Sequence, residues 1–419
     1  MTLSTSRARQ DARDPIVIDP LVEDLAAETA RLRDAGPVTP VELPGGVPVW
    51  AVTHHAEGRA LLTDARLVKN IEHWAAWKRG EIPQTWPLIG LAAPGPSMLT
   101  FDGAEHRRLR TLVAQALTPR RVQELEPRIA EITAALLDEV AERGAASGGR
   151  VDLKAAFAYR LPMAVISELM GIDSADHPRL LELYDSFFSS LTRPERVQEV
   201  LGELRAFYTS VVDLKRAEPA DDLTSALIAA SEDGDRLGER EIVSTLQVMV
   251  TAGHETTISL IVSAVVALLT HPEQLALVRE GRVTWDAVIE ETLRWSAPTT
   301  HVLIRFATED IAVGDTVIPR GDAVIMSYGA MGRDRNQHGE DADTFDVTRS
   351  PNRHLSFGHG PHVCPGAPLS RLEARVALPA LFARFPELAL AVAPQELRNK
   401  PAVTQNELYE LPVLLDGQR

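Results

Sequence analysis

The sequence predicts a mainly helical protein with a smaller β-rich region. Three observations carry this prediction. Apolar residues recur at helical spacing through most of the 419 residues. One such run, residues 239–269, is unusually long for a helix of a globular protein. Short stretches of alternating apolar residues, bounded by turn residues, cluster at residues 41–52, 299–306, 310–327 and from 388 onward.

No segment of the chain has the composition of a linker. We find no stretch rich in Gly, Ser or Pro that would divide the chain, and no internal repeat is evident. With 45% hydrophobic residues, the chain can bury a sizeable core. We therefore expect one domain over residues 1–419, with residues 1–18 as a flexible N-terminal segment.

The net charge and the cysteine content limit the kinds of binding partner and the cellular compartment that we expect for this protein. The formal net charge of −16 argues against a nucleic-acid partner. A single cysteine excludes an internal disulfide and fits a reducing compartment. The N-terminal residues lack the apolar core of a signal peptide, and the apolar run 258–269 is too short to span a bilayer. The sequence thus predicts a monomeric, cytoplasmic protein without membrane contact.

Helical spacing predicts most of the elements in chain order. Helices are expected over residues 21–35, 55–63, 104–117, 121–143, 153–170, 177–191, 195–216, 239–269, 285–295 and 367–385. Gly45 and Gly46 mark the turn of an early hairpin, and residues 404–406 the tip of a final one. Residues 67–100 form an irregular, tryptophan-bearing loop, which is either a functional lid or a loop that its tryptophans pack down.

The single cysteine, Cys364, lies in the run Ser-Phe-Gly-His-Gly-Pro-His-Val-Cys-Pro-Gly that ends at Gly366. It precedes a predicted helix, whose first backbone N–H groups stabilise an anion such as a thiolate. Gly358, Gly360 and Gly366 leave room for a flat object close to the backbone, and Phe357 can pack beneath it. Taken alone, a lone buried cysteine is more often an inert small hydrophobic residue.

Three helical motifs accompany this loop. The long predicted helix contains Ala-Gly-His-Glu-Thr-Thr at residues 252–257, and glycine with adjacent threonines is locally unfavourable in a helix. We expect a local distortion there, although a stray sequence in a core helix is the plainer interpretation. His106 and Arg110 share one helix face, which by itself would be a solvated basic face. Glu291 and Arg294 are spaced for an ion pair, a common and weak signal.

Together with the pattern Phe-x-x-Gly-x-x-x-Cys-x-Gly, these motifs resemble those of the cytochrome P-450 superfamily, in the same order and over about residues 19–415. The resemblance implies the cytochrome P-450 fold, with haem b between the long central helix and the cysteine loop with its following helix. It makes Cys364 the axial thiolate ligand of the iron. It also implies haem contacts from Phe357, Gly358 and Ala252, and propionate binding by His106, Arg110, Arg305 and His362.

The resemblance also implies roles in catalysis. Thr256 would hydrogen-bond dioxygen or an ordered water, and Glu255 would relay protons from solvent. Glu291 and Arg294, with Arg349 as their partner, would brace the cysteine loop and take no part in the chemistry. One mild departure is Pro365, which has no N–H to offer the sulfur.

The expected substrate pocket draws on several segments. Alternation along the strand 299–306 places His301, Leu303 and Arg305 on one face, and His301 is a polar wall residue in preference to a metal ligand. The full set of predicted pocket residues is Trp86, Phe187, Gln247, Val248, Ala252, His301, Leu303 and Gln405. We expect Gln247 and Gln405 to bind opposite ends of a substrate, although Gln247 could equally bond only to neighbouring helices.

The implied activity is haem-thiolate monooxygenation of a hydrophobic small molecule, such as a steroid or a macrolactone. Electrons derived from NAD(P)H would arrive through a separate ferredoxin reductase and ferredoxin, since the chain has no room for a flavin domain. The ferredoxin would dock near Arg107, Arg108 and Arg371. Two alternatives remain: a peroxygenase or another haem-thiolate enzyme without monooxygenation, and a non-catalytic haem sensor. The intact Glu255-Thr256 pair argues against the first, and the lack of a visible output domain against the second.

Overall fold

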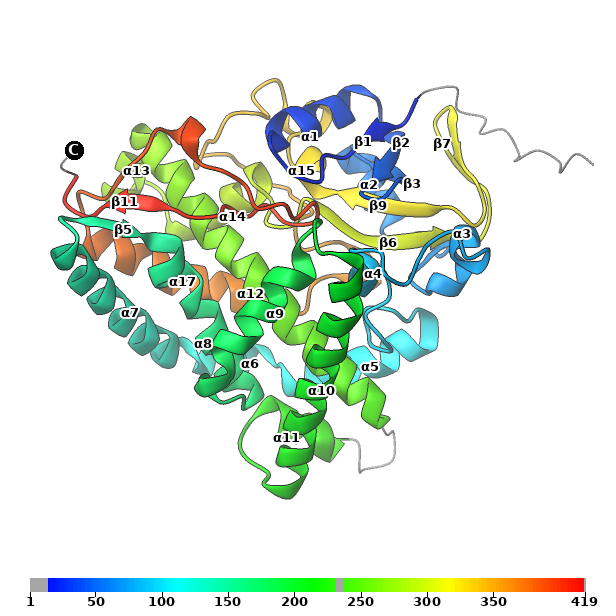
Figure 1. The fold of residues 1–419 in the computed structure, drawn as a ribbon. Coiled ribbons are helices and arrows are strands. Elements are labelled where there is room, and N and C mark those ends of the chain that lie inside the picture. Colours follow the sequence, from blue (N-terminus) through cyan, green and yellow to red (C-terminus); the bar gives the residue numbers. More distant parts are fainter. Residues whose placement is uncertain (1–13, 231–236, 418–419) are drawn as a thin grey trace, which may run out of the picture.

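The computed structural model describes residues 14–230 and 237–417, and its helices and strands gather in two regions (Figure 1). The predicted division into a helical part and a β-rich part is therefore confirmed. The main sheet has the strand order β1-β2-β3-β9-β6-β4. Its strands are β1 (Ile16–Val17), β2 (Val38–Leu43), β3 (Val47–Val52), β4 (Leu67–Val68), β6 (His301–Ala307) and β9 (Ala323–Ser327).

The main sheet brings together two distant parts of the chain, residues 16–68 and residues 301–327. β2 and β3 form the predicted hairpin, and Gly45 and Gly46 turn it with φ values of 85° and 74°. β1 pairs in parallel with β2, so residues 16–17 are ordered and the predicted flexible segment is too long. Residues 1–13 of that segment lie outside the described residues.

The predicted meander over 310–327 is only half right. β7 (Ile311–Val313) and β8 (Thr316–Ile318) form a hairpin, but β9 leaves them and inserts between β3 and β6. The register of β6 against β9 shifts between Val302 and Arg305, so strict alternation fails there. The side chain of Leu303 lies outside the described residues.

The predicted helices are present in the expected order, and most of them begin or end a few residues away from the predicted positions. They are α1 (Leu25–Asp34), α2 (His55–Leu61), α3 (Ala75–Lys78), α4 (Ile89–Ala92), α5 (Gly103–Ala116), α6 (Pro119–Glu124), α7 (Glu126–Ala146), α8 (Arg160–Met170), α9 (His177–Phe188), α10 (Pro194–Ala217), α11 (Leu223–Ala230), α12 (Glu239–Thr270), α13 (Pro272–Arg279), α14 (Trp285–Trp295), α15 (Tyr328–Met331), α16 (Arg335–His338) and α17 (Ala367–Arg384). A π-helical turn, Lys154–Ala158, precedes α8, and short 3-10 turns occupy parts of the loops. The sequence analysis did not predict α11 or α13.

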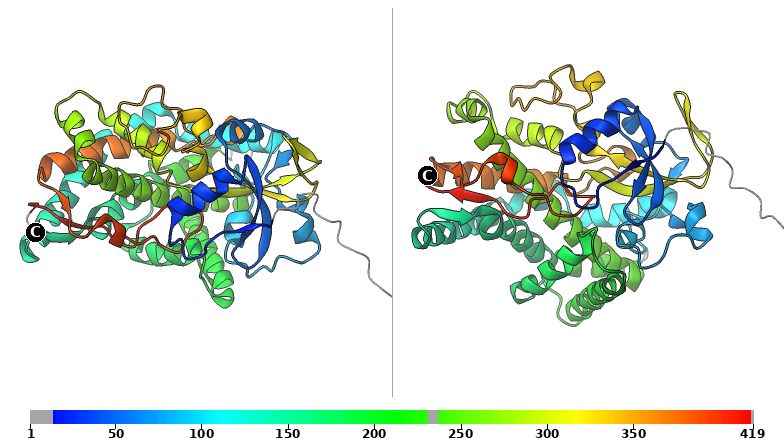
Figure 2. Two further views of the ribbon diagram at one scale, coloured as in Figure 1. Left: turned by 90° about the horizontal axis from the view of Figure 1, so that it is seen from above. Right: turned by 45° about the horizontal axis from the view of Figure 1, so that its top comes forward.

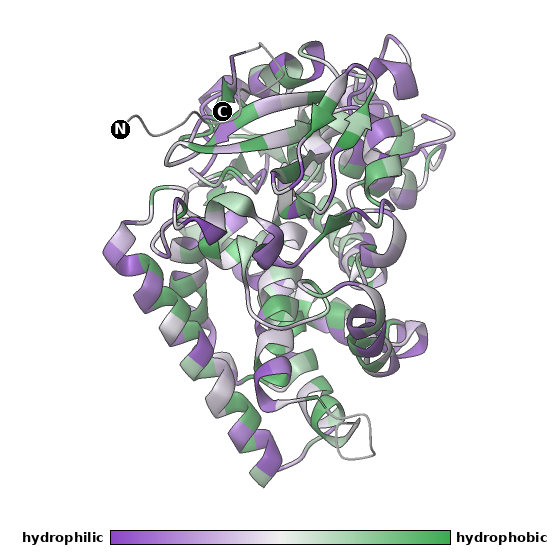
Figure 3. Cartoon of the chain, turned by 90° about the vertical axis from the view of Figure 1, so that its right-hand side faces the viewer, coloured by the Kyte–Doolittle hydropathy of each residue, from purple (hydrophilic) through white to green (hydrophobic). Residues whose placement is uncertain are grey.

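Helix α12 is the axis around which the helical part packs (Figure 1). It contacts α8, α10, α14 and α17, and most of its side chains are buried. Within the described residues it is the one helix long and apolar enough to cross a membrane, yet it lies inside the fold as a core helix does. The outer helices alternate hydrophilic and hydrophobic residues, as expected for helices with one solvated face (Figure 3).

The C-terminal segment crosses the molecule and ends beside the helical part (Figure 2). β10 (Ala389–Leu390) pairs with β11 (Pro412–Leu414), and β11 pairs with β5 (Arg150–Asp152). Between β10 and β11 the chain extends toward the start of β6, where Gln405 forms a bridge with Thr299. The predicted hairpin tip is thus confirmed, and it lies against the main sheet.

Candidate active site

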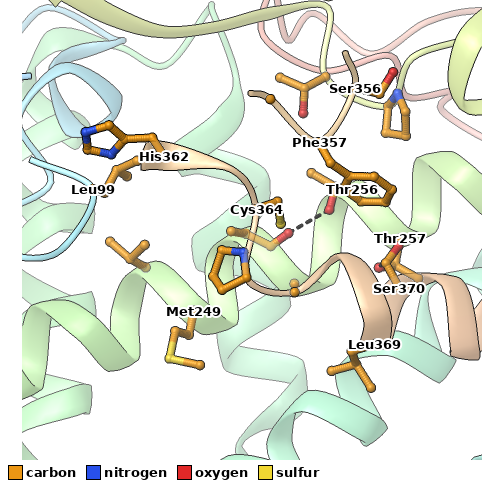
Figure 4. A pocket seen from close by; sticks show the side chains of 18 of the residues that line it. Leu99, Met249, Thr256, Thr257, Ser356, Phe357, His362, Cys364, Leu369 and Ser370 are labelled. Carbon is orange, nitrogen blue, oxygen red and sulfur yellow. Dashed lines mark hydrogen bonds between the residues drawn. The ribbon is translucent and has the colours of Figure 1, made fainter. Parts of the chain in front are cut away.

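A cavity lies between α12 and the segment that carries Cys364 (Figure 4). It encloses about 1460 Å³ free of protein atoms, including space that is open to solvent. Thr256 from α12 and Cys364 from the loop before α17 line facing walls. Most of the remaining lining is apolar, as in sites that take a large flat cofactor. It includes Met98, Leu99, Leu117, Ile166, Leu169, Met249, Leu293, Phe357 and Leu369.

The loop at Cys364 is fixed by its own backbone. The Cys364 N–H donates to the Phe357 carbonyl at 2.8 Å, and Gly358 takes a φ of 76° that favours glycine. Burial raises the pKa of the Cys364 thiol, while backbone N–H groups of Gly366 and Ala367 at the start of α17 oppose this by stabilising the thiolate. The predicted anion-stabilising helix start is therefore present beside the sulfur.

Gly360 has a different role from the one the sequence suggested. A Cβ at this position would lie 2.7 Å from Thr63 Cγ2 and 3.2 Å from the Leu62 carbonyl oxygen. The glycine is thus needed where the loop packs on the end of α2, and not where an object in the cavity approaches. Gly358 and Gly366 do line the cavity, as predicted.

Basic side chains gather at one side of the cavity. Arg110, Arg305 and His362 line it, as predicted, and Lys69 joins them. Arg305 is 4% and Lys69 5% exposed, and burial lowers the pKa of both, that of Lys69 strongly. Sequence reasoning missed Lys69, because nothing in a loop lysine shows that it will be buried. Asp102 accepts the Lys69 backbone N–H at 2.7 Å and orders this wall.

Two histidines, His106 and His362, contact each other at this wall with their rings tilted by 44°. The rings of His106 and His362 lie 4.2 Å apart between centroids. His362 Nε2 is 3.2 Å from Asp102 Oδ1, whereas His106 Nε2 is buried without a hydrogen-bond partner in the described structure. Burial, the nearby His362 and Arg110 lower the pKa of His106 to about 4, so this ring is neutral at pH 7. His106 itself is not among the cavity-lining residues.

On α12, Ala252, Gly253 and Thr256 face the cavity. The Thr256 hydroxyl donates to the Ala252 carbonyl at 2.7 Å, one turn earlier. The helix assignment continues through this turn, so the expected distortion does not appear as a break in α12. The methyl group of Ala252 and the absence of a side chain at Gly253 leave free space beside the Thr256 hydroxyl.

Glu255 turns away from the cavity, although its neighbour Thr256 faces it. Its carboxyl is buried, and Oε1 lies 3.4 Å from Nδ1 of His254. Burial alone would raise the pKa of Glu255, but interaction with His254 and with Lys400 lowers it to about 2. The predicted acid is thus ionised and belongs to a buried charge cluster on the other side of the helix.

A second carboxyl, which the sequence analysis missed, does line the cavity. Glu373 of α17 is 2% exposed, and burial raises its pKa to about 8. Nearby, the hydroxyls of Thr257 and Ser370 lie 3.3 Å apart and also line the cavity. A glutamate within an otherwise apolar helix face is the sequence signal that could have identified this group.

A second cavity, with about 650 Å³ free of protein atoms, adjoins the first. The two share the lining residues Leu99, Val248, Ala252, Thr256 and Thr299. Six of the predicted pocket residues line it: Phe187, Gln247, Val248, Ala252, His301 and Gln405. Leu91, Leu99, Thr299 and Thr404 complete much of the wall. Oε1 of Gln405 and Oγ1 of Thr404 are buried without hydrogen-bond partners in the described residues.

Trp86 was wrongly predicted to line the substrate pocket. Its indole N–H donates to the Pro44 carbonyl at 2.7 Å, and its ring packs edge-on against Trp74. The 67–100 segment is thus held against the β2–β3 turn by its tryptophans, while Gly90, Leu91 and Leu99 line the cavities. The loop was expected either to be a functional lid or to be packed down by its tryptophans, and the contacts of Trp86 agree with the second interpretation.

His301 lies at the cavity wall as a hydrogen-bonded side chain. Its Nε2 is 3.3 Å from Oε1 of buried Glu28 of α1. Among the described residues, no cluster of three or more His, Cys, Asp or Glu side chains could hold a metal ion. The polar-wall interpretation of His301 fits these contacts.

The three residues expected to brace the loop do meet. Glu291 and Arg294 form a bidentate pair of 2.7 and 2.8 Å, and Arg349 Nε lies 3.6 Å from Glu291 Oε1. Glu291 also accepts the Asp346 N–H at 2.8 Å and the Asn352 side-chain amide at 2.9 Å. Helix α14 is thereby tied to the segment that leads into the Cys364 loop.

Comparison with known proteins agrees with this geometry. The family model "Cytochrome P450" matches residues 163–412. CYP154C4 from Streptomyces sp. W2061 is 64% identical, with a TM-score of 0.94 over 96% of this chain and 98% of that one. A structure described as "Testerone bound CYP154C4" from Streptomyces sp. ATCC 11861 is 63% identical, with a TM-score of 0.93 over 96% and 98%. The 6-deoxyerythronolide B hydroxylase of Saccharopolyspora erythraea is 39% identical over 93% of this chain and 95% of its own length.

The chain belongs to the cytochrome P450 family and is a haem-containing monooxygenase. As in that family, it uses haem with a cysteine thiolate on iron, dioxygen and electrons that derive from NAD(P)H. The cavity fits this cofactor in three respects. It joins a thiol with two backbone N–H partners, an apolar lining, and a wall with Lys69, Arg110 and Arg305 for two carboxylates.

Proposed function

We propose that this enzyme hydroxylates a steroid-like molecule that lies in the cavity between α9, α12 and the Gln405 tip. The observation that carries the proposal is a pair of glutamines at the walls of an apolar chamber beside Thr256. Gln247 comes from α12 and Gln405 from the C-terminal segment, so they can reach different ends of one rigid ligand. The relative described as "Testerone bound", which we take to mean testosterone, supports a steroid.

Within this proposal, the chain's own residues hold the cofactor. Cys364 would supply the thiolate that binds the iron, and Phe357, Gly358 and Ala252 would border the macrocycle. Lys69, Arg110, Arg305 and His362 would bind its propionates, and His106 would support His362 through ring contact. When bound, haem supplies the activation of dioxygen, which no amino-acid side chain provides.

Thr256 and Glu255 control protons in the proposed reaction. The Thr256 hydroxyl lies at the junction of the two cavities, where it can hold dioxygen or a water by a hydrogen bond. Glu255 passes protons to it from the far side of α12. The ionised carboxylate of Glu255 thus lies outside the substrate chamber, which remains apolar.

We also propose a ferredoxin donor that docks at a hollow beside the Cys364 loop. Arg59, Arg353 and His359 line it together with Arg371. The basic patch expected from the sequence carries less unpaired positive charge than assumed. Arg108 pairs with Glu105 and Glu241, and Arg371 pairs with Glu290. Arg59 and Arg353 are exposed and are the better candidates to meet an acidic partner in the cytoplasm.

A macrolactone is the second candidate substrate, since 6-deoxyerythronolide B hydroxylase is a relative by sequence. The two classes differ in what the glutamines can do. A steroid is flat and rigid, and presents its polar atoms at two ends. A macrolactone carries oxygens around a ring and would depend less on any single pair of contacts.

Binding experiments test the proposed substrate class. Testosterone is titrated into the ferric enzyme while the spin-state change in the visible spectrum is followed. Gln247→Ala and Gln405→Ala should each raise the Kd by up to about tenfold, because one hydrogen bond contributes about 0.5–1.5 kcal/mol. Thr209→Ala, at a partly exposed site on α10 outside both cavities, is the matched control. Unchanged affinity and regioselectivity in both glutamine variants would contradict the proposal.

A further inference from the structure

A buried histidine and a buried glutamate meet at one wall of the second cavity. His301 of β6 lines this cavity and is 2% exposed. Its Nε2 lies 3.3 Å from Oε1 of Glu28, which is 4% exposed and lines neither cavity. The other ring nitrogen, Nδ1, is buried and has no hydrogen-bond partner among the described residues. Because buried polar atoms are rarely left unpaired, Nδ1 is a candidate to bind a group of the substrate.

The surroundings of Glu28 stabilise its carboxylate form. The backbone N–H of Asp19 donates to Oε2 of Glu28 at 2.7 Å. Glu28 also lies in the first turn of α1, where the N-terminal end of the helix stabilises a negative charge. Carboxyl groups are ordinarily much stronger acids than imidazole, so the proton in the contact with His301 lies on Nε2. Both oxygens of Glu28 therefore accept, one from the backbone and one from the ring.

A proton on Nε2 decides what the second nitrogen of His301 can bind. A neutral imidazole has one N–H group and one nitrogen with a lone pair, so Nδ1 is then an acceptor. Nε2 is directed at Glu28, which lies outside the cavity, and this leaves Nδ1 as the nitrogen for a ligand. A hydroxyl group can donate to it, whereas a ketone oxygen only accepts and cannot pair with it.

The neighbouring part of the wall has the same preference. The Thr300 N–H donates to the Thr404 carbonyl at 3.1 Å, and Thr299 forms a bridge with Gln405, so the start of β6 lies beside the C-terminal tip. Oε1 of Gln405 and Oγ1 of Thr404 are buried without partners in the described structure, as Nδ1 of His301 is. Of these three atoms two only accept, and the hydroxyl can donate or accept. A hydrogen-bond donor is therefore the ligand group that suits this end of the cavity.

We propose that His301 selects substrates with a hydroxyl group, which donates to Nδ1, and that Glu28 is the positioning residue that keeps Nδ1 an acceptor. The inference rests on the proposed steroid substrate and adds which end of it meets this wall. Testosterone carries a hydroxyl at one end and a ketone at the other. Its hydroxyl end would face His301, and its ketone end would be left for Gln247 of α12, whose amide N–H groups can donate to it.

Two steroids that differ in one group test the selection. Androstenedione has a ketone where testosterone has its hydroxyl, so it presents an acceptor at either end. Each is titrated into the ferric holoenzyme at pH 8, above the range in which histidine ordinarily titrates, and the spin-state change is followed. We expect a Kd about tenfold lower for testosterone, and His301→Phe should bring the two Kd values close together. Equal Kd values in the unsubstituted enzyme, or an unchanged ratio in His301→Phe, would overturn the proposal.

Glu28→Gln should reverse the preference. The Asp19 N–H still requires an oxygen at the place of Oε2, so the NH₂ group of the new amide faces Nε2 of His301 and donates to it. The ring proton then moves to Nδ1, which becomes a donor, and androstenedione should bind more tightly than testosterone. If Glu28 had a merely structural role, both Kd values would rise and their ratio would stay the same. Glu23→Gln, at an exposed site just before α1, is the matched control and should leave both Kd values unchanged.

A second readout does not depend on any substrate. Nitrogen NMR spectra are recorded at pH 8 on the diamagnetic ferrous carbonyl form of the holoenzyme with isotopically labelled histidine, and the His301 signals are identified by their loss in His301→Phe. We expect the ring proton on Nε2 in the unsubstituted enzyme and on Nδ1 in Glu28→Gln. A proton on Nδ1, or on both nitrogens, of the unsubstituted enzyme would overturn the inference. If neither steroid changes the spin state, the proposed substrate class is wrong instead, and the NMR result still decides whether Glu28 keeps Nδ1 an acceptor.

Discussion

The buried carboxylate of Glu291 offers a sharp test of how the Cys364 loop is held. Glu291→Ala removes the acceptor of two Arg294 bonds, of the Asp346 N–H and of the Asn352 amide. Arg294 is 0% exposed, so its charge cannot turn to water when the partner is lost. Breaking such a pair costs about 3–5 kcal/mol, a large part of the about 5–15 kcal/mol that holds a typical protein folded.

The measurement is urea unfolding of the holoenzyme, followed by far-UV circular dichroism and by the haem absorbance. We expect Glu291→Ala to lower the free energy of unfolding by that amount and to release haem at lower urea, since Asn352 and Asp346 lead into the loop. Glu280→Ala is the control, because Glu280 and Arg282 pair at the surface with 58% and 67% exposed side chains. It should cost at most about 1 kcal/mol. A loss in Glu291→Ala as small as in the control, with haem retained, would refute the reasoning.

Three further predictions concern the site itself. In Thr256→Ala, NADPH and dioxygen should be consumed at near the normal rate while the yield of product per NADPH falls about tenfold. The measurement compares product formed with oxygen taken up. An unchanged yield of product per NADPH would show that Thr256 does not control proton delivery. Arg305→Ala should speed haem transfer to apomyoglobin about tenfold, because a buried cation at the propionate wall is lost; an unchanged rate would contradict that assignment. In the folded protein the pKa of Glu373 is about 8, above its ordinary value of 4.5. The contribution of protonated Glu373 to the free energy of unfolding is therefore complete below pH 4.5. It is lost as the pH rises toward 8, at about 1.4 kcal/mol per pH unit. Glu373→Gln should therefore flatten the fall in unfolding free energy between pH 6 and 8, and an equally steep fall in the variant would show that another group causes it.

Sequence patterns correctly predicted those helices that are determined by residues close together in the chain. Helix α12 was expected over 239–269 and is found over Glu239–Thr270, because a long, largely apolar run follows Gly238, whose N–H is capped by Glu241 at 2.7 Å. The helix at 285–295 was predicted with its observed bounds for a similar reason. α11 and α13 were missed, since each has 8 residues and too few turns to establish a period.

The remaining differences concern information that is not local. Trp86 was expected in the pocket, but its position is decided by the Pro44 carbonyl on another segment. The shift of register in β6 depends on pairing with β9, so alternation could not reveal it. Lys69 and Glu373 become notable only through burial, and the ion pair between Lys154 and Glu407 joins segments far apart in the chain. Motif recognition identified the walls of the cavity, whereas ion pairs between distant segments could be found only from the coordinates.

The path of the C-terminal segment has a consequence for the evolution of this enzyme. One short stretch carries Gln405, which borders the substrate chamber, and Lys400 and Glu407, which form a largely buried set of ion pairs with Asp185 and Lys154. Selection for a new substrate through this stretch would disturb these ion pairs as well. Exchanging the stretch between relatives should therefore alter selectivity and stability together, and library designs that aim at selectivity alone would do better to vary Phe187 on α9.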